Sequence, residues 1–187
     1  CKPVMINEIS AANTMYVNDY FKKNDWIELY NTTDSDIDIA GMYVSDNLDK
    51  PQKYQVPTDD VALNTVIPAH GYKVLWADKL ENMGSEIHTS FKLSAEGGVV
   101  MIATDECSDT LTYTQHIGSQ SFGRYPDGAQ TAFVMNIPTI AKANIASVDD
   151  DRLGTPSTPN GISTIALEGG VAIAYTDGVV NAKSEDS

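Results

Sequence analysis

Short runs of alternating apolar and polar residues, separated by turn-forming residues, recur along most of the chain. In the clearest run, residues 25–31, Ile27 and Leu29 point to one face and the residues between them point to the other. The polar residues 31–36 have the chemistry of a turn, and the alternation resumes over residues 37–39. This region therefore predicts two β-strands joined by a turn.

Comparable patterns recur at similar spacing before and after this region. We expect further strands over residues 4–9, 39–46, 72–77, 89–94, 99–103, 111–113 and 132–135. Gly97 and Gly98 are a hairpin signal, and the nearly continuous apolar run that follows them is typical of a strand buried on both faces. Strands at this spacing, with few helical periods between them, predict an all-β sandwich.

The pattern changes near the C-terminus. Short alternating runs at residues 162–167, 171–175 and 179–180 are separated by turns that contain glycine. Because an isolated hairpin is marginal in water, we expect these strands to pair with an edge of the sandwich or with another molecule, which would make a homo-oligomer if that molecule is a second copy. We therefore predict a sandwich over residues 1–160 and a β-hairpin-like extension, the start of a truncated domain, over residues 161–187.

Length and charge narrow the classes of partner. A chain of 187 residues can bury one good core with a small appendage. Its net charge of −14 opposes binding to nucleic acid and to anionic membranes, and it fits solubility, cation binding or an extracellular location. The sequence has no apolar run long enough for a transmembrane helix.

Cys1 and Cys107 are the two cysteines of the chain. Since the sequence begins at Cys1 without a methionine, two interpretations stay open: a lipid-anchored first residue of a mature bacterial lipoprotein, or an arbitrary boundary within a longer protein. A disulfide between Cys1 and Cys107 would form in an oxidising compartment, but two cysteines are too few to indicate a disulfide framework. We expect Cys107 to be a buried free thiol.

Motifs for catalysis are missing from the sequence. The three histidines, His70, His88 and His116, have no metal-binding spacing, and we expect them in turns and loops. The sequence contains neither a nucleophile elbow nor a phosphate-binding glycine loop. We therefore expect no enzymatic activity.

Acidic and amide side chains near strand ends make calcium the more serious chemical hypothesis. The candidate ligands are Asn7, Glu8, Asp25 and Asp46, and residues 149–151 form a second acidic cluster. Neither group has the regular spacing of an EF-hand. The alternative is that these residues cap turns through side-chain hydrogen bonds, and we prefer it.

Aromatic residues in loops are the remaining candidates for ligand contact. Tyr16, Tyr20 and Tyr54 could face a carbohydrate, on which aromatic rings stack, or could cover the sandwich. Trp26 and Trp76 alternate with apolar neighbours, so we expect both in packed positions.

Several blocks of the sequence resemble those of the lamin-tail domain, an immunoglobulin-like β-sandwich. They are Val4 to Ile9, Trp26 to Asn31, Ile39 to Asp46, Ile67 to Ala77, Ser121 to Gly128 and Thr155 to Asn160. Each block is short, so the resemblance rests on their number and order. It covers the chain from Val4 to Asn160 and looks most like the bacterial, secreted branch of the family.

The resemblance implies an accessory module without activity of its own, of the kind attached to nucleases, hydrolases and cell-surface proteins. It also implies a basic partner for the acidic residue of the second strand, so we expect an ion pair between Arg124 and Glu28, with Glu8 as the other candidate acid. We thus expect a non-catalytic binding or scaffolding module of a secreted or cell-surface bacterial protein, with a protein or a neighbouring domain as its partner. The alternative is a calcium- or carbohydrate-binding module.

Overall fold

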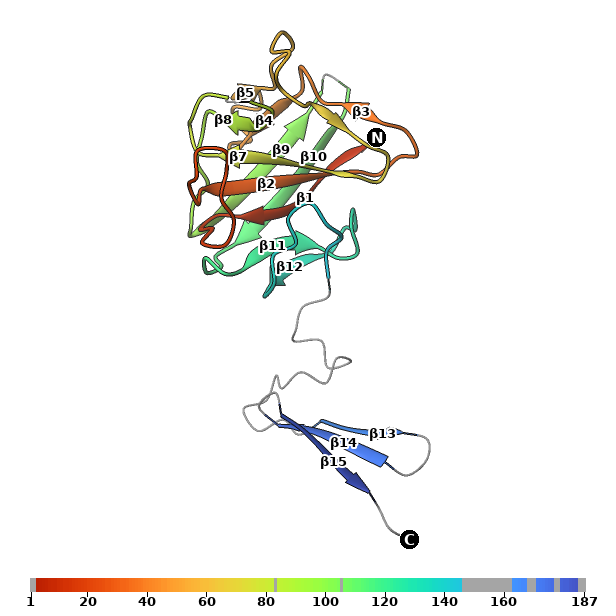
Figure 1. The fold of residues 1–187 in the computed structure, drawn as a ribbon. Coiled ribbons are helices and arrows are strands. Elements are labelled where there is room, and N and C mark those ends of the chain that lie inside the picture. Colours follow the sequence, from red (N-terminus) through yellow and green to blue (C-terminus); the bar gives the residue numbers. More distant parts are fainter. Residues whose placement is uncertain are drawn as a thin grey trace. The chain divides into compact units, whose positions relative to one another are not determined.

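A computed structural model describes most of the chain as β-strands joined by turns and loops (Figure 1). The described residues are 3–82, 84–104, 106–145, 163–167, 171–176 and 179–184. They contain no helix, and therefore no helix that could cross a membrane. The chain divides into two units, Cys1–Ile145 and Ala146–Ser187, which are described separately.

The first unit contains a six-stranded sheet with the order β12-β11-β1-β2-β7-β8. Its strands are β1 (Val4–Ser10), β2 (Asp25–Asn31), β7 (Tyr72–Ala77), β8 (Ile87–Thr89), β11 (Ser121–Arg124) and β12 (Ala132–Met135). Neighbouring strands are antiparallel except β7 and β8, which are parallel. An irregularity in β1 between Ile6 and Glu8 shifts the register, so that Glu8 lies directly opposite Glu28 of β2.

A second, four-stranded sheet crosses behind the first (Figure 1). Its order is β10-β9-β4-β5, formed by β4 (Tyr43–Ser45), β5 (Tyr54–Gln55), β9 (Gly97–Ala103) and β10 (Ser108–Thr114). Two short strands, β3 (Ile37–Asp38) and β6 (Val66–Ile67), pair separately. This arrangement confirms the predicted all-β fold with an immunoglobulin-like sandwich.

The hydrophobic core takes the inward positions of both sheets. Ile27 and Leu29 of β2 are fully buried there, as their alternation predicts, together with Val100 and Ile102 of β9. Burying an aliphatic side chain of this size contributes roughly 1.5–3 kcal/mol to stability. The alternating pattern thus places its apolar face where the two sheets meet.

The outer face of the six-stranded sheet is buried as well, which confirms the packed positions predicted for Trp26 and Trp76. Trp26 and Glu28, on the opposite face of β2 from the core, have no exposed surface. Two irregular segments, residues 11–24 and 136–145, cover them: the ring of Tyr16 packs edge-on against Trp26, with centroids 6.2 Å apart, and the other segment bonds to Glu28. The sandwich therefore carries an irregular third layer.

The second unit contains a three-stranded antiparallel sheet with the order β13-β14-β15. Its strands are β13 (Ser163–Leu167), β14 (Val171–Thr176) and β15 (Val179–Ser184), which confirms the predicted β extension. The three strands pair with one another. The predicted boundary at residue 160 stays a prediction, because residues 146–162 lie outside the described part of the chain.

The expectation of a buried free thiol at Cys107 is wrong. Cys107 is half-buried and disulfide-bonded. It ends a tight turn in which its backbone N–H donates to Oγ1 of Thr104 at 3.0 Å. The only other cysteine of the sequence is Cys1, which lies outside the described residues.

Candidate functional site

The loop between β1 and β2, residues 11–24, is built around two buried asparagines. The first, Asn13, accepts hydrogen bonds through Oδ1 from the N–H groups of Met15 and Tyr16 at 2.9 and 3.0 Å. Its Nδ2 donates to the carbonyls of Tyr16 and Asn24 at 2.7 and 2.9 Å. One side chain therefore ties the beginning of the loop to its end.

The second asparagine, Asn18, closes a tight turn. Its Oδ1 accepts from the N–H groups of Tyr20 and Lys22, each at 3.0 Å, and its Nδ2 donates to Asp78 at 3.0 Å. Within this turn Phe21 adopts a φ of 57° and 89% of its surface is exposed. The left-handed backbone costs a non-glycine residue about 1–2 kcal/mol, so the hydrogen bonds around Asn18 hold the backbone at Phe21 in an intrinsically unfavourable conformation.

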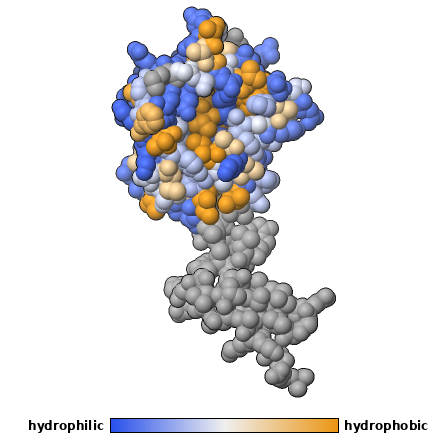
Figure 2. Space-filling view, viewed as in Figure 1, coloured by the Kyte–Doolittle hydropathy of each residue, from blue (hydrophilic) through white to orange (hydrophobic). Residues whose placement is uncertain are grey.

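Other apolar residues of the same loop are exposed. Met15 and Val17 leave 55% and 54% of their surface in solvent. Beside them lies an open groove of about 380 Å³, whose lining includes Tyr16, Val17, Tyr72, Trp76 and Ile140. Apolar groups of this kind interrupt a largely hydrophilic surface (Figure 2).

His88 lies in β8 against this loop, with its side chain fully buried. Its Nδ1 lies 3.0 and 3.1 Å from the two carboxylate oxygens of Asp78, and its Nε2 lies 3.0 Å from Oδ1 of Asp19. The ring of Tyr20 packs edge-on against the imidazole, with centroids 5.3 Å apart. The prediction that His88 lies in a loop is therefore wrong, whereas His70 is exposed in a turn, as expected.

Asp78 is held firmly in this position. Its Oδ2 accepts from Nδ2 of Asn18 and of Asn24 at 3.0 and 2.9 Å, and its Oδ1 accepts from the N–H of Leu80 at 3.0 Å. The carboxylate that orients His88 is thus fixed by the same asparagine that shapes the turn. Loop and imidazole form one connected polar structure.

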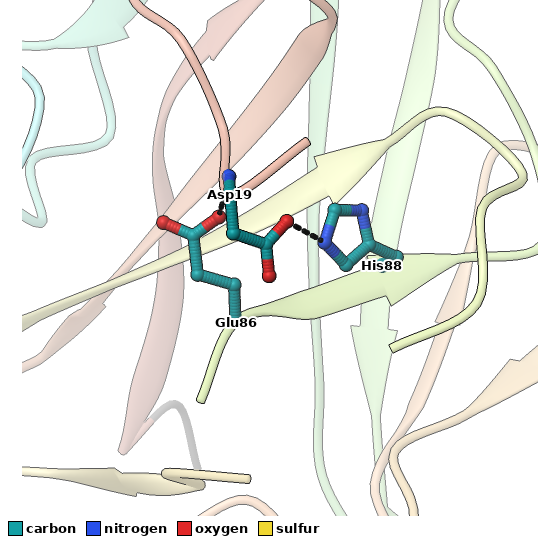
Figure 3. Close-up of side chains that lie close together, drawn as sticks. All are labelled: Asp19, Glu86 and His88. Atoms are coloured by element: carbon teal, nitrogen blue, oxygen red, sulfur yellow. Dashed lines mark hydrogen bonds and ion pairs between the residues drawn. The ribbon is translucent and has the colours of Figure 1, made fainter. Parts of the chain in front are cut away.

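Glu86 completes a group of three side chains (Figure 3). Its Oε2 accepts a hydrogen bond of 2.8 Å from the backbone N–H of Asp19, and ligand atoms of Asp19, Glu86 and His88 lie within 4.8 Å of one another. Oδ2 of Asp19 is buried and has no hydrogen-bond partner among the described residues. Ligand atoms of two carboxylates and one imidazole therefore lie close together, with Glu86 bonded to the backbone of Asp19 and His88 next to its carboxylate.

A second polar cluster lies deeper, between the six-stranded sheet and residues 136–145. The carboxylate of Glu8 accepts from the N–H and the hydroxyl of Thr139 at 3.0 and 2.8 Å, and from the hydroxyl of Ser121. That of Glu28 accepts from the N–H of Ala141 at 2.5 Å. Both glutamates are completely buried.

Burial controls the ionisation of this pair. It raises the pKa of Glu8, and burial together with the charge of Glu8 raises the pKa of Glu28 to about 9. Glu28 is therefore protonated at neutral pH. No surface of either carboxyl group reaches solvent, and the hydrogen bonds of the pair attach residues 136–145 to the sheet.

Asp127 extends this cluster toward the surface. Its Oδ1 accepts from Nδ2 of Asn7 at 3.0 Å and from the N–H of Asn144 at 2.9 Å. Its Oδ2 accepts from the hydroxyl of Tyr72 at 2.5 Å; burial and this hydrogen bond raise the pKa of Tyr72. The network thus reaches from β1 to the groove beside the loop.

Arg124 pairs with Asp109 and not with Glu28, so the predicted ion pair is wrong. Its Nη2 lies 3.1 Å from Oδ2 of Asp109, and both side chains are almost fully buried. The reason is strand alternation in β11: Phe122 and Arg124 point inward between the sheets, whereas Ser121 points outward to Glu8.

Comparison with protein families finds a match over most of the first unit. The family described as Lamin Tail Domain matches residues 1–116, more than half of the 187 residues. The chain belongs to the lamin tail domain family. In this lamin tail domain the match ends just after β10, while β11 and β12, which complete the six-stranded sheet, follow it. Comparisons with curated proteins and with solved structures found no match.

The lamin tail domain does not bring the predicted calcium ligands together. Those residues were Asn7, Glu8, Asp25 and Asp46. Asn7 and Glu8 belong to the buried cluster, Asp25 accepts from the N–H of Leu93 at 3.1 Å, and Asp46 pairs with Lys53 at 2.5 Å. Burial raises the pKa of Asp25 to about 6. Residues 149–151 lie outside the described part of the chain.

The predicted ligand-facing tyrosines are also separated. Tyr16 lines the groove beside the loop, and Tyr54 lines a different one, which also touches His88. Tyr20 uses its ring against His88 and its hydroxyl on the carbonyl of Glu81, at 3.0 Å. The three rings therefore do not form a single stacking face. What the domain does present together is the shaped loop of residues 11–24, the groove beside it and the group around His88.

Proposed function

We propose that this lamin tail domain is a non-catalytic protein-binding module and that loop 11–24 is its recognition surface. The observation that carries the proposal is the exposed ring of Phe21, held at a φ of 57° by the turn around buried Asn18. A loop backbone that is fixed before binding loses little conformational entropy when a partner closes over it. Aromatic residues are also frequent anchors at the centres of protein interfaces.

The surroundings of Phe21 fit the same role. Met15 and Val17 extend the apolar surface of the loop, and the groove of about 380 Å³ adjoins it. A net charge of −14 favours a protein partner, or a neighbouring domain, whose contact surface has a basic rim around an apolar pocket.

We also propose that the domain has no catalytic activity of its own. Glu8 and Glu28, which lie opposite each other on neighbouring strands, are both completely buried and occupied by hydrogen bonds to the protein itself. We further propose that the module works in a secreted or cell-surface bacterial protein. The disulfide at Cys107 supports this, because disulfides persist in oxidising compartments.

A photo-crosslinking amino acid at position 21 tests the proposal in cells of the source organism. Position 61 is the matched control, because Val61 is a fully exposed apolar residue outside the loop. We expect a discrete crosslinked protein from position 21 that an excess of the unmodified domain suppresses and that position 61 does not produce. Equal crosslinking patterns from the two positions would show that the loop is ordinary surface.

Carbohydrate binding is the second candidate. The groove beside the loop is lined by the partly exposed rings of Tyr16 and Tyr72, and aromatic rings are suited to stacking on sugars. Calorimetry against a glycan panel tests this alternative. Heat of binding to a glycan that is lost in a Tyr16→Ala variant would favour carbohydrate binding. The absence of heat with every glycan of the panel would exclude it.

A further inference from the structure

We propose that Asp19, Glu86 and His88 form a zinc site that fixes loop 11–24 to the edge of the six-stranded sheet (Figure 3). The three residues come from two separate parts of the chain, the loop and the β8 region. The proposal is independent of whether the loop binds a protein.

The first argument is the arrangement of acceptors around the two ring nitrogens of His88. Its Nδ1 faces both carboxylate oxygens of Asp78, at 3.0 and 3.1 Å, so this nitrogen must carry a hydrogen. In the neutral imidazole the other nitrogen, Nε2, then has a lone pair. That lone pair points at Oδ1 of Asp19, 3.0 Å away, which is also an acceptor. Two acceptors at this distance repel each other unless a proton or a cation lies between them.

The second argument is geometric. Ligand atoms bound to zinc at about 2.0–2.1 Å in a tetrahedron lie about 3.3 Å apart. The separation of 3.0 Å between Asp19 and His88 is close to this value, and the ligand atom of Glu86 lies within 4.8 Å of the others. Small side-chain movements would bring all three into the coordination sphere, with water as the fourth ligand.

The third argument is an unused ligand atom. Oδ2 of Asp19 has almost no exposed surface and accepts no hydrogen bond from the described residues, although the side chain as a whole is 21% exposed. A bound cation would satisfy it. The group can be reached from solvent through Asp19, whose side chain keeps 21% of its surface exposed.

The chemical types of the three candidate ligands favour zinc over calcium. Calcium prefers oxygen ligands alone and takes six to eight of them, whereas an imidazole with two carboxylates suits zinc. The hydrogen bond from His88 to Asp78 has the carboxylate–histidine–metal arrangement that orients the ring and strengthens it as a ligand. A hydrogen on Nε2 of His88 would compete with zinc for the position between this nitrogen and Oδ1 of Asp19.

Isothermal titration calorimetry with zinc chloride tests the proposal on the full chain, prepared without a histidine tag and stripped with a chelator. We expect one zinc ion per chain, and affinity at least tenfold lower in Asp19→Asn and in His88→Gln. His70→Gln is the matched control, because His70 also contacts an aspartate, Asp34 at 2.7 Å, but on the surface. The control should bind zinc like the wild type.

Because His88→Gln removes a buried hydrogen-bonded group and can impair folding, Glu86→Gln at the half-buried rim provides a second loss-of-ligand variant. Circular dichroism should show that this variant is folded while its zinc affinity falls. Nitrogen NMR of His88 gives an independent readout, because zinc must displace any hydrogen from Nε2. Any of four results would overturn the proposal. They are no zinc binding, unchanged zinc affinity in Asp19→Asn and Glu86→Gln, retention of both ring N–H groups of His88 with zinc present, and a response to calcium chloride alone.

Discussion

Replacing Glu28 by glutamine should stabilise the domain at neutral and alkaline pH. Glu28 has a pKa of about 9 in the folded protein, against an ordinary value of 4.5, because it is buried beside Glu8. Between these two values the folded state binds more protons than the unfolded state. The free energy of unfolding therefore falls as the pH rises through this window, and the loss is complete above pH 9.

The size of the effect follows from the shift. Each unit of pH above 4.5 costs about 1.4 kcal/mol until the folded-state pKa is reached, so the penalty at pH 7 is about 3 kcal/mol. Glutamine has the same shape and carries no charge, and its carbonyl can still accept the hydrogen bond from Ala141. The variant should therefore gain up to about 3 kcal/mol at pH 7 and close to nothing near pH 4.

Urea unfolding at pH 4.5, 7 and 9 measures this difference. The control is Glu96→Gln, which removes an exposed carboxylate from a turn and should leave the pH dependence unchanged. If the wild type were equally stable across this range, or if Glu28→Gln were no more stable than the wild type at pH 7, Glu28 would be ionised in the folded protein. The account of the buried cluster would then be wrong.

Two further predictions concern the corrected contacts. Arg124→Met should destabilise the domain by about 3–5 kcal/mol in the same urea assay, because it leaves Asp109 charged and buried. The control is Lys53→Met, which removes the surface pair with Asp46 and should cost less than about 1 kcal/mol. Similar losses in both variants would contradict the inward position of Arg124. Peptide mapping without reduction should recover Cys107 in a disulfide with the only other cysteine, Cys1. A sulfur in a disulfide cannot carry a lipid, so an acylated Cys1 or a free thiol at Cys107 would refute this pairing.

The β-sandwich could be predicted from the sequence because its strands alternate apolar and polar residues. Ile27 and Leu29 identify their inward face by alternation alone, and the short runs after residue 160 correctly predict β13, β14 and β15. Alternation does not reveal that residues 11–24 and 136–145 cover the outer face. The burial of Glu28 on that face therefore had no signal in the local pattern, whereas the apolar neighbours of Trp26 correctly predicted its packed position.

The site was harder to predict because its residues meet through pairings that leave no local trace. His88 meets Asp19, 69 positions away, only because β8 pairs in parallel with β7 and the loop folds back over it. The direction of Arg124, by contrast, could have been found. Phe122, two residues earlier in the same strand, is apolar, and strand alternation puts both on the inner face, away from Glu28.

The binding affinity of the partner identified by crosslinking, measured for Phe21→Ser and Val61→Ser, tests the central claim most directly. Both substitutions remove an exposed apolar side chain, and only the first lies in loop 11–24. A recognition anchor predicts a loss of at least about 2 kcal/mol, roughly thirtyfold in affinity, for Phe21→Ser, and less than about threefold for Val61→Ser. Equal and small losses in both variants would show that the exposed ring of Phe21 is not what the partner recognises.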